Sequence, residues 1–333
     1  MKHNVTIKHK LGLGTAPLGN MFRDVPEDEA MATIESAWNE GIRYFDTAPF
    51  YGAGLAELRL GEALSSYDRD DYLLSSKVGR IVLDEEEEKE GLFEFGRKNK
   101  IHTDYTESGT LRSIEDSLKR LKTDRLDMVY VHDISPDFLG DEWITKFDEA
   151  RHGAFKVLDR LRDEGVIKAW GLGVNMTTPI EVALELEEAH PDLSLSATQY
   201  TLLQHERALE RMMPLAEKTD GGLVIGSAFN SGALLGGDHF DYAEITPEIK
   251  ERVARFNEAA QNHGVQLKDA ALQFSTAHPA VKAVVTGSTR PGHIKEDLAA
   301  MTADIPPAFW DEIVDKGLVS PKAPLPKNDN EEQ

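Results

Sequence analysis

The feature that most constrains the fold is a regular alternation of short apolar strands with amphipathic helices. Each helix carries the chain back to the starting edge of the sheet, so successive strands run parallel. Eight such units are what a closed (β/α)8 barrel, or TIM barrel, requires, and the long loops then lie at its C-terminal face. The expected strands are 11–16, 42–46, 72–77, 126–131, 168–174, 193–199, 222–226 and 281–286.

An open, doubly wound parallel sheet is the alternative arrangement. That fold places a Gly-x-Gly-x-x-Gly turn between a strand and a helix, and Gly12-Leu13-Gly14 is only a lone pair of glycines. The 333 residues contain no Pro/Gly/Ser-rich linker. We therefore expect one barrel domain over residues 1–320, followed by a polar, flexible tail over residues 321–333.

Long loops interrupt the alternation at residues 79–108 and 133–148. Long loops in a compact domain are usually functional, and the first of them combines a run of four glutamates with aromatic residues, which predicts a partly ordered lid. Glycines within residues 232–237 mark a further, flexible loop. The aromatic residues of the two long loops are Phe93, Phe95, Tyr105, Phe138 and Trp143.

Composition excludes several classes of protein. Fifty-nine acidic residues against 37 Lys+Arg give a net charge of −22, which disfavours binding to nucleic acid or anionic membranes and indicates either solubility or adaptation to high salt. There is no cysteine and no His-Glu-x-x-His, so we expect no disulfide and no metal site. The N-terminus lacks a signal-peptide core and no apolar run reaches membrane-spanning length, so the predicted location is cytoplasmic.

Polar residues stand at or just beyond the ends of five predicted strands. One polar residue after a strand is more often a cap or a turn residue than a catalyst. The carboxyl ends of barrel strands meet at one rim, however, so the set as a whole predicts a site. Tyr51 follows the first member by five residues and belongs with it. The five residues are Asp46, Lys77, His132, Asn175 and Gln199.

The residue types of this set suit proton transfer. A phenol ionises near pH ~10, and a nearby ammonium lowers that pKa. A carboxylate beside the ammonium keeps it charged and in place, and a neutral imidazole can polarise a carbonyl or lactol oxygen. Such a site exchanges a proton with oxygen while another group transfers a hydride.

The sequence resembles the aldo-keto reductase superfamily along nearly the whole barrel. The motif Asp46-Thr47-Ala48-x-x-Tyr51-Gly52, with Lys77 and His132, matches the family's Asp-Tyr-Lys-His tetrad in type, order and spacing. The resemblance implies that Tyr51 is the general acid/base, that Lys77 and Asp46 tune it, and that His132 orients the substrate. It also implies a nicotinamide cofactor, held by Asn175, Gln199, Phe229, Ser288, Arg290, Glu296 and Asp297.

Residues around these motifs are similar to a subgroup that oxidises cyclic hemiacetals to lactones. It includes D-threo-aldose 1-dehydrogenases, also known as L-fucose or L-galactose dehydrogenases, and pyridoxal 4-dehydrogenases. The resemblance implies a small sugar or aldehyde as substrate, with free aldoses ahead of pyridoxal. Two residues depart from the wider family: Val174 replaces a serine, and Phe229 stands in for a missing tyrosine that stacks on the nicotinamide.

The loop after the last strand, residues 286–297, predicts that NAD is used at least as well as NADP. In the family this loop carries a cationic fork for the 2′-phosphate. Gly287 occupies the usual lysine position and His293 the usual arginine position, and a histidine is mostly neutral at pH 7. Arg290 lies on the same loop and could swing to a phosphate.

Two rival functions remain open at this point. A Schiff-base lyase could use Lys77, although Asp46 beside it favours the charged ammonium rather than the nucleophilic amine. Some barrels of this superfamily act as non-catalytic, nucleotide-binding regulatory subunits. The sequence leaves the oligomeric state open.

Overall fold

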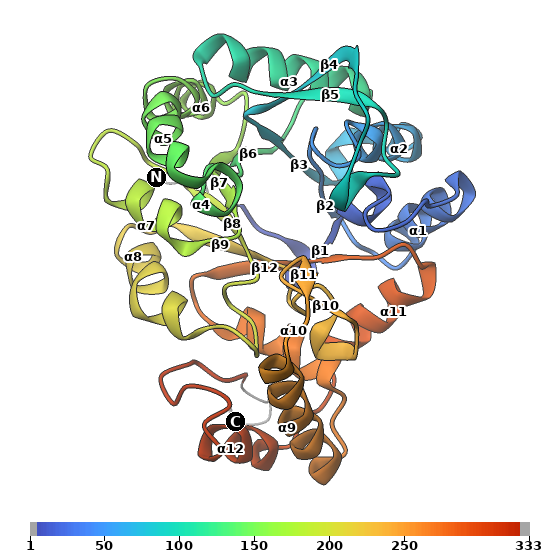
Figure 1. Cartoon of the computed structure of the whole chain (residues 1–333), viewed down its shortest axis with the longest axis vertical. Helices are drawn as coiled ribbons and strands as arrows, with labels where there is room; N and C mark the ends of the chain where they lie inside the picture. Colours follow the sequence, from blue (N-terminus) through green and yellow to red (C-terminus); the bar gives the residue numbers. More distant parts are fainter. Residues whose placement is uncertain (1–4, 327–333) are drawn as a thin grey trace.

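The computed structural model describes residues 5–326 and forms a closed barrel of parallel strands (Figure 1). The strands adjoin in the order β1-β12-β9-β8-β7-β6-β3-β2, and β2 closes the ring on β1. The (β/α)8 prediction is confirmed and the open doubly wound sheet is wrong. The barrel strands are β1 (Leu11–Gly14), β2 (Tyr44–Asp46), β3 (Leu73–Val78), β6 (Met128–His132), β7 (Ala169–Val174), β8 (Leu193–Ala197), β9 (Gly222–Gly226) and β12 (Val281–Gly287).

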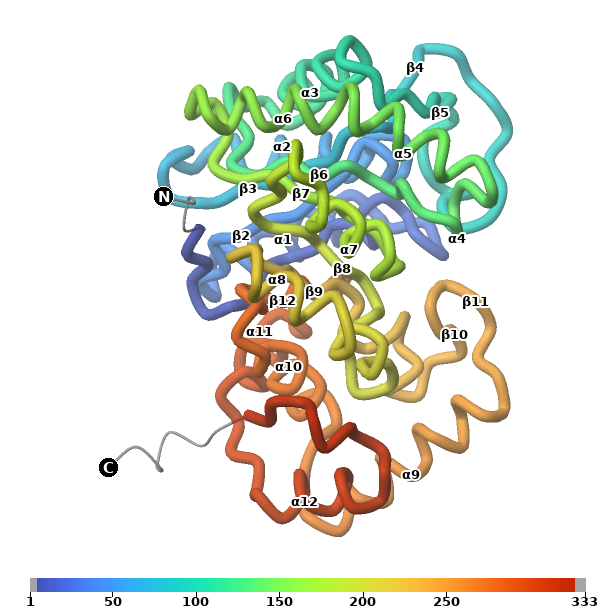
Figure 2. The backbone as a smooth tube through the Cα atoms, turned by 90° about the vertical axis from the view of Figure 1, so that its left-hand side faces the viewer, coloured from blue at the N-terminus to red at the C-terminus, as the bar shows by residue number. Residues whose placement is uncertain are grey.

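Helices surround the barrel as an outer layer (Figure 1). They are α1 (Glu27–Asn39), α2 (Leu55–Leu64), α3 (Glu107–Leu121), α6 (Ala154–Asp163), α7 (Thr177–Glu185), α8 (Met213–Lys218), α10 (Leu267–Ala277) and α11 (Pro291–Ala300). Helices α9 (Pro247–His263) and α12 (Pro307–Asp315) pack together at one end of the molecule, opposite the hairpin of β4 (Arg80–Glu86) and β5 (Asn99–Thr103) (Figure 2).

Two apolar cores follow from the alternation of side chains along each strand. One face of β6 sends Met128 and Tyr130 into the barrel interior, and the other face packs Val129 and Val131 against the helices. Inside the barrel, the hydroxyl groups of Tyr44 and Tyr130 lie 3.1 Å apart and satisfy each other. Both cores are continuous, so the strands are fixed in position beneath the loops that carry the site.

The first long loop, residues 79–108, is ordered around an antiparallel hairpin of β4 (Arg80–Glu86) and β5 (Asn99–Thr103). The prediction of partial order is confirmed. In Figure 2 this hairpin projects from one end of the molecule. The glutamates of β4 are exposed, whereas Tyr105, which follows the hairpin, is fully buried and joins it to the barrel.

Two segments expected as loops have regular structure. Residues 133–148 form α4 (Pro136–Leu139) and most of α5 (Trp143–His152). The buried side of α5 consists of Phe147 and Ala150, an apolar stripe too narrow to predict a helix from sequence. The glycine-rich segment, residues 232–237, holds a 3-10 turn, and a short hairpin of β10 (His239–Phe240) and β11 (Ala243–Glu244) follows it.

The C-terminal segment is packed further than expected. Residues 321–326 follow the predicted boundary at residue 320, yet Ala323 is buried and Leu325 contacts the core. The rest of the predicted tail lies outside the described residues.

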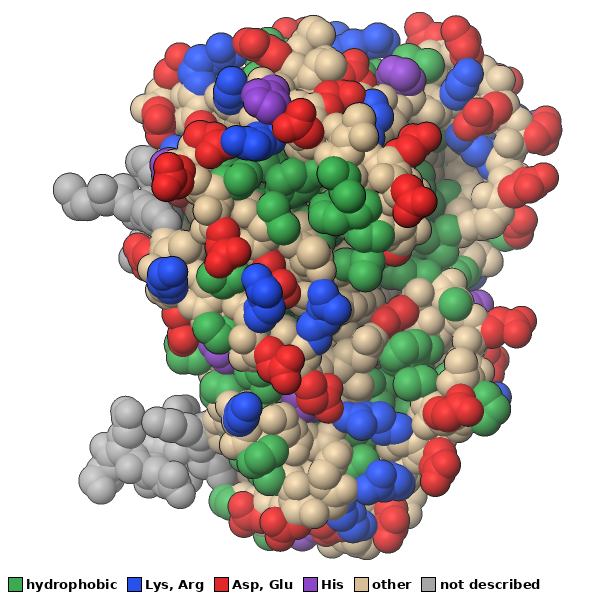
Figure 3. Space-filling view, turned by 60° about the vertical axis from the view of Figure 1, so that its left-hand side comes forward, with side chains coloured by type: hydrophobic (Ala, Val, Ile, Leu, Met, Phe, Trp, Pro, Cys, Tyr) green, Lys and Arg blue, Asp and Glu red, His purple; other side chains and the backbone are tan. Residues whose placement is uncertain are grey.

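Acidic side chains are spread across the face shown in Figure 3, around an apolar area at its centre. None of the helices between residues 5 and 326 is long and apolar enough to cross a membrane.

Candidate active site

The C-terminal rim of the barrel brings the four predicted catalytic residues together. Asp46 ends β2, Lys77 lies near the end of β3, His132 ends β6, and Tyr51 follows β2 in a turn. The ammonium of Lys77 lies 4.7 Å from the centre of the Tyr51 ring, and the rings of Tyr51 and His132 are 5.8 Å apart, edge to face. The three strand ends thus converge on one phenol.

Lys77 and Asp46 form a buried ion pair beneath this phenol. Lys77 Nζ donates to Asp46 Oδ2 over 2.7 Å and to the carbonyl oxygen of Thr47 over 2.8 Å. The second carboxylate oxygen accepts a 2.6 Å hydrogen bond from Ser75 Oγ, which itself contacts Tyr44. Both charges are almost fully buried, so these additional hydrogen bonds are what make the pair tolerable inside the protein.

Two glycines fix the turn that carries Tyr51. Gly52 has a φ of +61°, and a Cβ atom on it would lie 2.2 Å from the carbonyl oxygen of Gly19. A Cβ atom on Gly19 would lie 2.6 Å from the carbonyl carbon of Tyr51. Only glycines permit the backbones of these two loops to touch, and this contact sets the position of the phenol.

The sequence predicts that the ammonium of Lys77 lowers the pKa of Tyr51, and this prediction is wrong. Burial of the phenol, followed by the negative charge of Asp46, raises the pKa of Tyr51 well above its usual value. The ammonium of Lys77 is already engaged by Asp46 and Thr47, so its charge is largely compensated. The phenol therefore holds its proton at neutral pH.

His132 is held as a neutral imidazole. Burial, with the positive charges of Lys77 and Arg80, lowers the pKa of His132 well below its usual value. The hydroxyl of Tyr105 donates to the carbonyl oxygen of His132 over 2.7 Å and fixes its backbone. Nε2 of His132 lies 3.5 Å from the carboxylate of Asp133, and Nδ1 of His132 has no hydrogen-bond partner among the described residues.

Two cavities meet at Tyr51. The larger, about 540 Å³, runs from Asp46 and Tyr51 to Ser288, His293 and Asp297 beyond β12. The smaller, about 260 Å³, contains the faces of Tyr51, Lys77 and His132. Residues common to both are Ala16, Met21, Tyr51, Leu195, Ala197 and Tyr242.

The larger cavity fits a nicotinamide dinucleotide. Its middle has apolar walls that include Phe229 and Leu235. Its far end lies at the start of α11, where backbone N–H groups and the helix dipole favour phosphate. There Lys268 Nζ donates to Glu296 over 2.6 Å and lies 3.3 Å from Asp297, which places one cation among the polar groups.

The predicted cofactor residues divide into those that line a cavity and those that do not. Gln199 and Glu296 line none of the cavities at this rim; the amide of Gln199 donates instead to Thr198 over 2.9 Å. Arg290 lines an adjoining cavity described below. Three of the predicted cofactor residues line the larger cavity: Phe229, Ser288 and Asp297. Asn175 lines the smaller cavity.

Tyr242 is a site residue that sequence reasoning missed. It stands in the turn between β10 and β11 with a φ of +69°, and its hydroxyl lies 2.9 Å from Ser227 Oγ. It lines both cavities, so an aromatic ring does occupy the region after β9 where the sequence showed no suitable tyrosine. The only available signal was a polar turn after two glycines, too short to predict a hairpin.

Asp133 and Arg80 are also present at the site without having been assigned a role. Burial raises the pKa of Asp133 to about 7, against the opposing charge of Arg80. The guanidinium of Arg80 lies 3.4 Å from the Asp133 carboxylate. Asp133 and Asp137 line the smaller cavity and give it a polar wall.

The aromatic residues at the rim only partly match the expectation. Phe93 lines the smaller cavity and stacks on Tyr51 with ring centres 5.9 Å apart. Phe95 is exposed and Trp143 packs on Phe147, and neither lines either cavity. Among the described residues, no group of three or more His, Asp or Glu side chains is arranged to hold a metal.

Comparison with known proteins identifies the family. The Aldo/keto reductase family model matches residues 10–317. The chain is 35% identical to D-threo-aldose 1-dehydrogenase of a Pseudomonas species over 93% of its length and 94% of the relative. It is 37% identical to pyridoxal 4-dehydrogenase of Microbacterium luteolum over 93% of this chain and 94% of the relative.

More distant matches agree with these. L-galactose dehydrogenase of Arabidopsis thaliana is 27% identical over 88% of this chain and 84% of the relative. The solved structure of an aldo-keto reductase from Bacillus halodurans matches with a TM-score of 0.70 and 24% identity. The match covers 93% of this chain and 92% of that one, and it shows that the two share a fold. The chain belongs to the aldo/keto reductase family, whose members are oxidoreductases that use nicotinamide cofactors.

Proposed function

From membership of this family, we propose that the chain is an NAD-dependent dehydrogenase that oxidises the cyclic hemiacetal of a small aldose to its lactone. The observation that carries the proposal is the smaller cavity, where Tyr51, Lys77 and His132 face the same space as Asp133 and Asp137. Acid–base groups and sugar-binding carboxylates are thereby within reach of one small molecule.

The chemistry divides between the nucleotide and the protein. When bound, the nicotinamide nucleotide supplies the hydride acceptor. In oxidation, the ionised form of Tyr51 takes the proton of the anomeric hydroxyl, and the ammonium of Lys77 lies 4.7 Å from the centre of its ring. In the reverse direction the same hydroxyl returns the proton to the carbonyl oxygen. Because burial raises the pKa of Tyr51, oxidation gains from higher pH.

His132 and the polar wall position the substrate. His132 lines the smaller cavity as a neutral imidazole, which can hydrogen-bond the reacting oxygen without competing for its proton. The cavity of about 260 Å³ lies below the roughly 300–1,000 Å³ of pockets for drug-sized ligands, which favours a small substrate.

Pyridoxal is a second candidate substrate, supported by the opposite wall of this cavity. Phe50, Phe93 and Phe138 line it, and the rings of Phe50 and Phe93 are 5.3 Å apart, edge to face. Such a wall suits a flat pyridine ring as well as the apolar face of a sugar. A lyase is disfavoured because Lys77 Nζ already donates to Asp46 and Thr47.

The use of NAD is supported by the loop after β12. A Cβ atom on Gly287 would lie 2.9 Å from Pro17, so a lysine does not fit there without a shift of that ring. His293 Nδ1 lies 3.2 Å from Ser288 Oγ, which engages its ring within the loop. Neither position presents a cation to a 2′-phosphate.

A panel of substrates tests the proposal. D- and L-aldoses, pyridoxal and simple aldehydes are assayed with NAD and with NADP, in both directions. We expect the highest kcat/KM for the oxidation of an aldose with NAD, and a smaller or comparable value for pyridoxal. Activity confined to hydrophobic ketones or steroids, or a tenfold preference for NADP, would contradict it.

A further inference from the structure

A third cavity, about 400 Å³, opens at the far end of the larger one. The loop after β1 forms one side through Arg23, and the loop after β12 forms the other through Thr289 and Arg290. It shares Ser288 and His293 with the larger cavity. A nucleotide whose nicotinamide lies at Tyr51 would place its adenosine half at this end.

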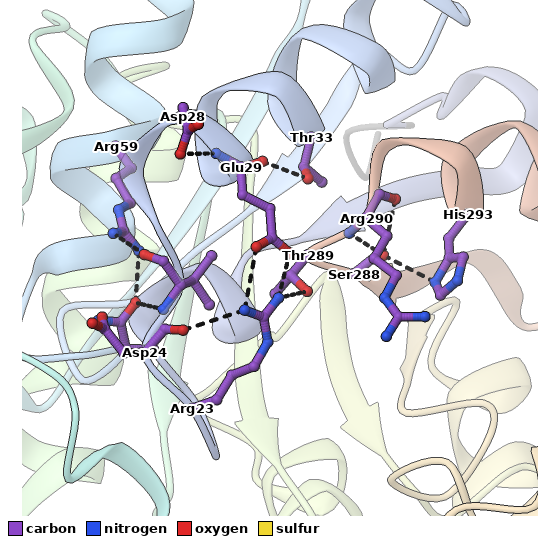
Figure 4. A network of polar contacts seen from close by, with 12 residues as sticks. Arg23, Asp24, Asp28, Glu29, Thr33, Arg59, Ser288, Thr289, Arg290 and His293 are labelled. Atoms are coloured by element: carbon purple, nitrogen blue, oxygen red, sulfur yellow. Dashed lines mark hydrogen bonds and ion pairs between the residues drawn. The ribbon is translucent and has the colours of Figure 1, made fainter.

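Arg23 joins the two sides of this cavity (Figure 4). Its Nη2 donates to Thr289 Oγ1 over 2.6 Å, and its Nη1 donates to the carbonyl oxygen of Asp24 over 3.2 Å. Both of its terminal nitrogens also contact the carboxylate of Glu29, a bidentate arrangement that fixes the plane of the guanidinium.

Glu29 lies in the first turn of α1 beside the cavity, where its carboxylate pairs with Arg23. Hydrogen bonding from Arg23, the charge of Arg23, a hydrogen bond with Thr289 and the charge of Arg290 lower the pKa of Glu29. Glu29 therefore carries a full negative charge at neutral pH. Among residues 5–326, it is the one acidic side chain within ion-pair distance of Arg23, and Arg290 has no ion pair there.

We propose that Glu29 sets the choice between NAD and NADP, because its carboxylate occupies the terminal nitrogens of Arg23, a guanidinium of this cavity that a 2′-phosphate would need. A free ribose hydroxyl is neutral and can donate a hydrogen bond to a carboxylate, whereas a phosphate dianion is repelled by it. Without the Glu29 charge, Arg23 and Arg290 present the planar donors that bind phosphate well. This inference rests on the proposed function.

The test measures nucleotide binding, which needs no substrate. NADH, NADPH, 5′-AMP and adenosine 2′,5′-bisphosphate are titrated into the wild type and Glu29→Gln. We expect the Kd of both 2′-phosphorylated ligands to fall at least tenfold in Glu29→Gln, with those of NADH and 5′-AMP changed less than threefold. Glu35→Gln is the matched control, since it removes the same charge from an exposed position on α1.

Two further variants keep the proposal falsifiable. When Glu29→Gln is combined with Arg23→Gln, the gain in affinity for NADPH should be lost. Arg23→Gln alone should bind NADPH more weakly than the wild type, because Glu29 is left without its cation. An unchanged ratio of NADPH to NADH affinity in Glu29→Gln, or an equal gain in Glu35→Gln, overturns the inference. If the wild type binds neither NADH nor NADPH, it is the proposed function that fails.

Discussion

The two ends of the barrel hold buried charges in different ways. At the N-terminal end, the carboxylate of Asp127 accepts from Arg69 over 2.6 Å, from Lys168 over 2.8 Å and from the backbone N–H of Leu74 over 2.9 Å. Burial alone would raise the pKa of Asp127, but hydrogen bonds from Lys168 and Arg69 lower it. The buried charge of Asp127 at this end is thus compensated by two cations and a backbone N–H.

The C-terminal end leaves groups without partners. His132 Nδ1 and Thr47 Oγ1 have no hydrogen bond among the described residues, and burial raises the pKa of Tyr51 and of Asp133. Compensated charges stabilise a fold, whereas perturbed titratable groups beside a cavity are typical of a functional site. Substitutions at the two ends should therefore separate stability from activity.

The largest expected effect is that of Tyr51→Phe. Loss of the proton-transferring hydroxyl should lower kcat by roughly 10²–10⁴-fold, the usual contribution of general acid–base catalysis. The ring contacts remain, so the melting temperature and the Kd for NADH should stay near the wild-type values. Turnover above about a tenth of the wild type, on that scale of effect, would remove Tyr51 from this role.

At the opposite end, Asp127→Asn should destabilise the protein without impairing the enzyme. The amide leaves Arg69 and Lys168 without their anion, and removing one partner of a buried pair costs about 3 kcal/mol. Chemical denaturation measures this loss, and kcat/KM at 25 °C should stay within twofold. Asp124→Asn, at a side chain that is 84% exposed, is the control and should change little. Equal losses in both variants would refute the contrast.

The smallest effect concerns pH. Because burial raises the pKa of Asp133 to about 7, the folded protein keeps a proton that the unfolded chain has released above about pH 4. The contribution of Asp133 to the free energy of unfolding therefore falls as pH rises towards 7 and stays constant above it. Relative to Asp133→Asn, the wild type should lose about 2 kcal/mol between pH 5 and 7.5.

Asp127 supplies the comparison for that measurement. Its pKa is lowered on folding, so its stabilising contribution is present above its unfolded value and is lost as pH falls through the acid range. Denaturation of the wild type, Asp133→Asn and Asp127→Asn at several pH values should give difference curves in separate windows with slopes of opposite sign. Slopes of the same sign would contradict the contrast between the two ends.

Much of the site was predictable because its residues stand where strands end. Asp46, Lys77 and His132 follow apolar segments whose period is plain, and parallel strands must bring their carboxyl ends to one rim. Tyr242 and Gln199 were not predictable in this way. Each depends on a local turn, Tyr242 in a hairpin and Gln199 beyond the end of β8, and turns redirect side chains without an apolar period to reveal it.

By itself, the sequence determined the order of strands and helices, the closed barrel and the convergence of the four residues at its rim. These follow from periodicity and connectivity, which are local properties of the chain. The tertiary structure decided the upward shift in the pKa of Tyr51, because burial and the Asp46 charge depend on distances in space. It also decided the contact between Arg23 and Thr289, 266 positions apart in the chain, which only the closed barrel brings within a hydrogen bond of each other.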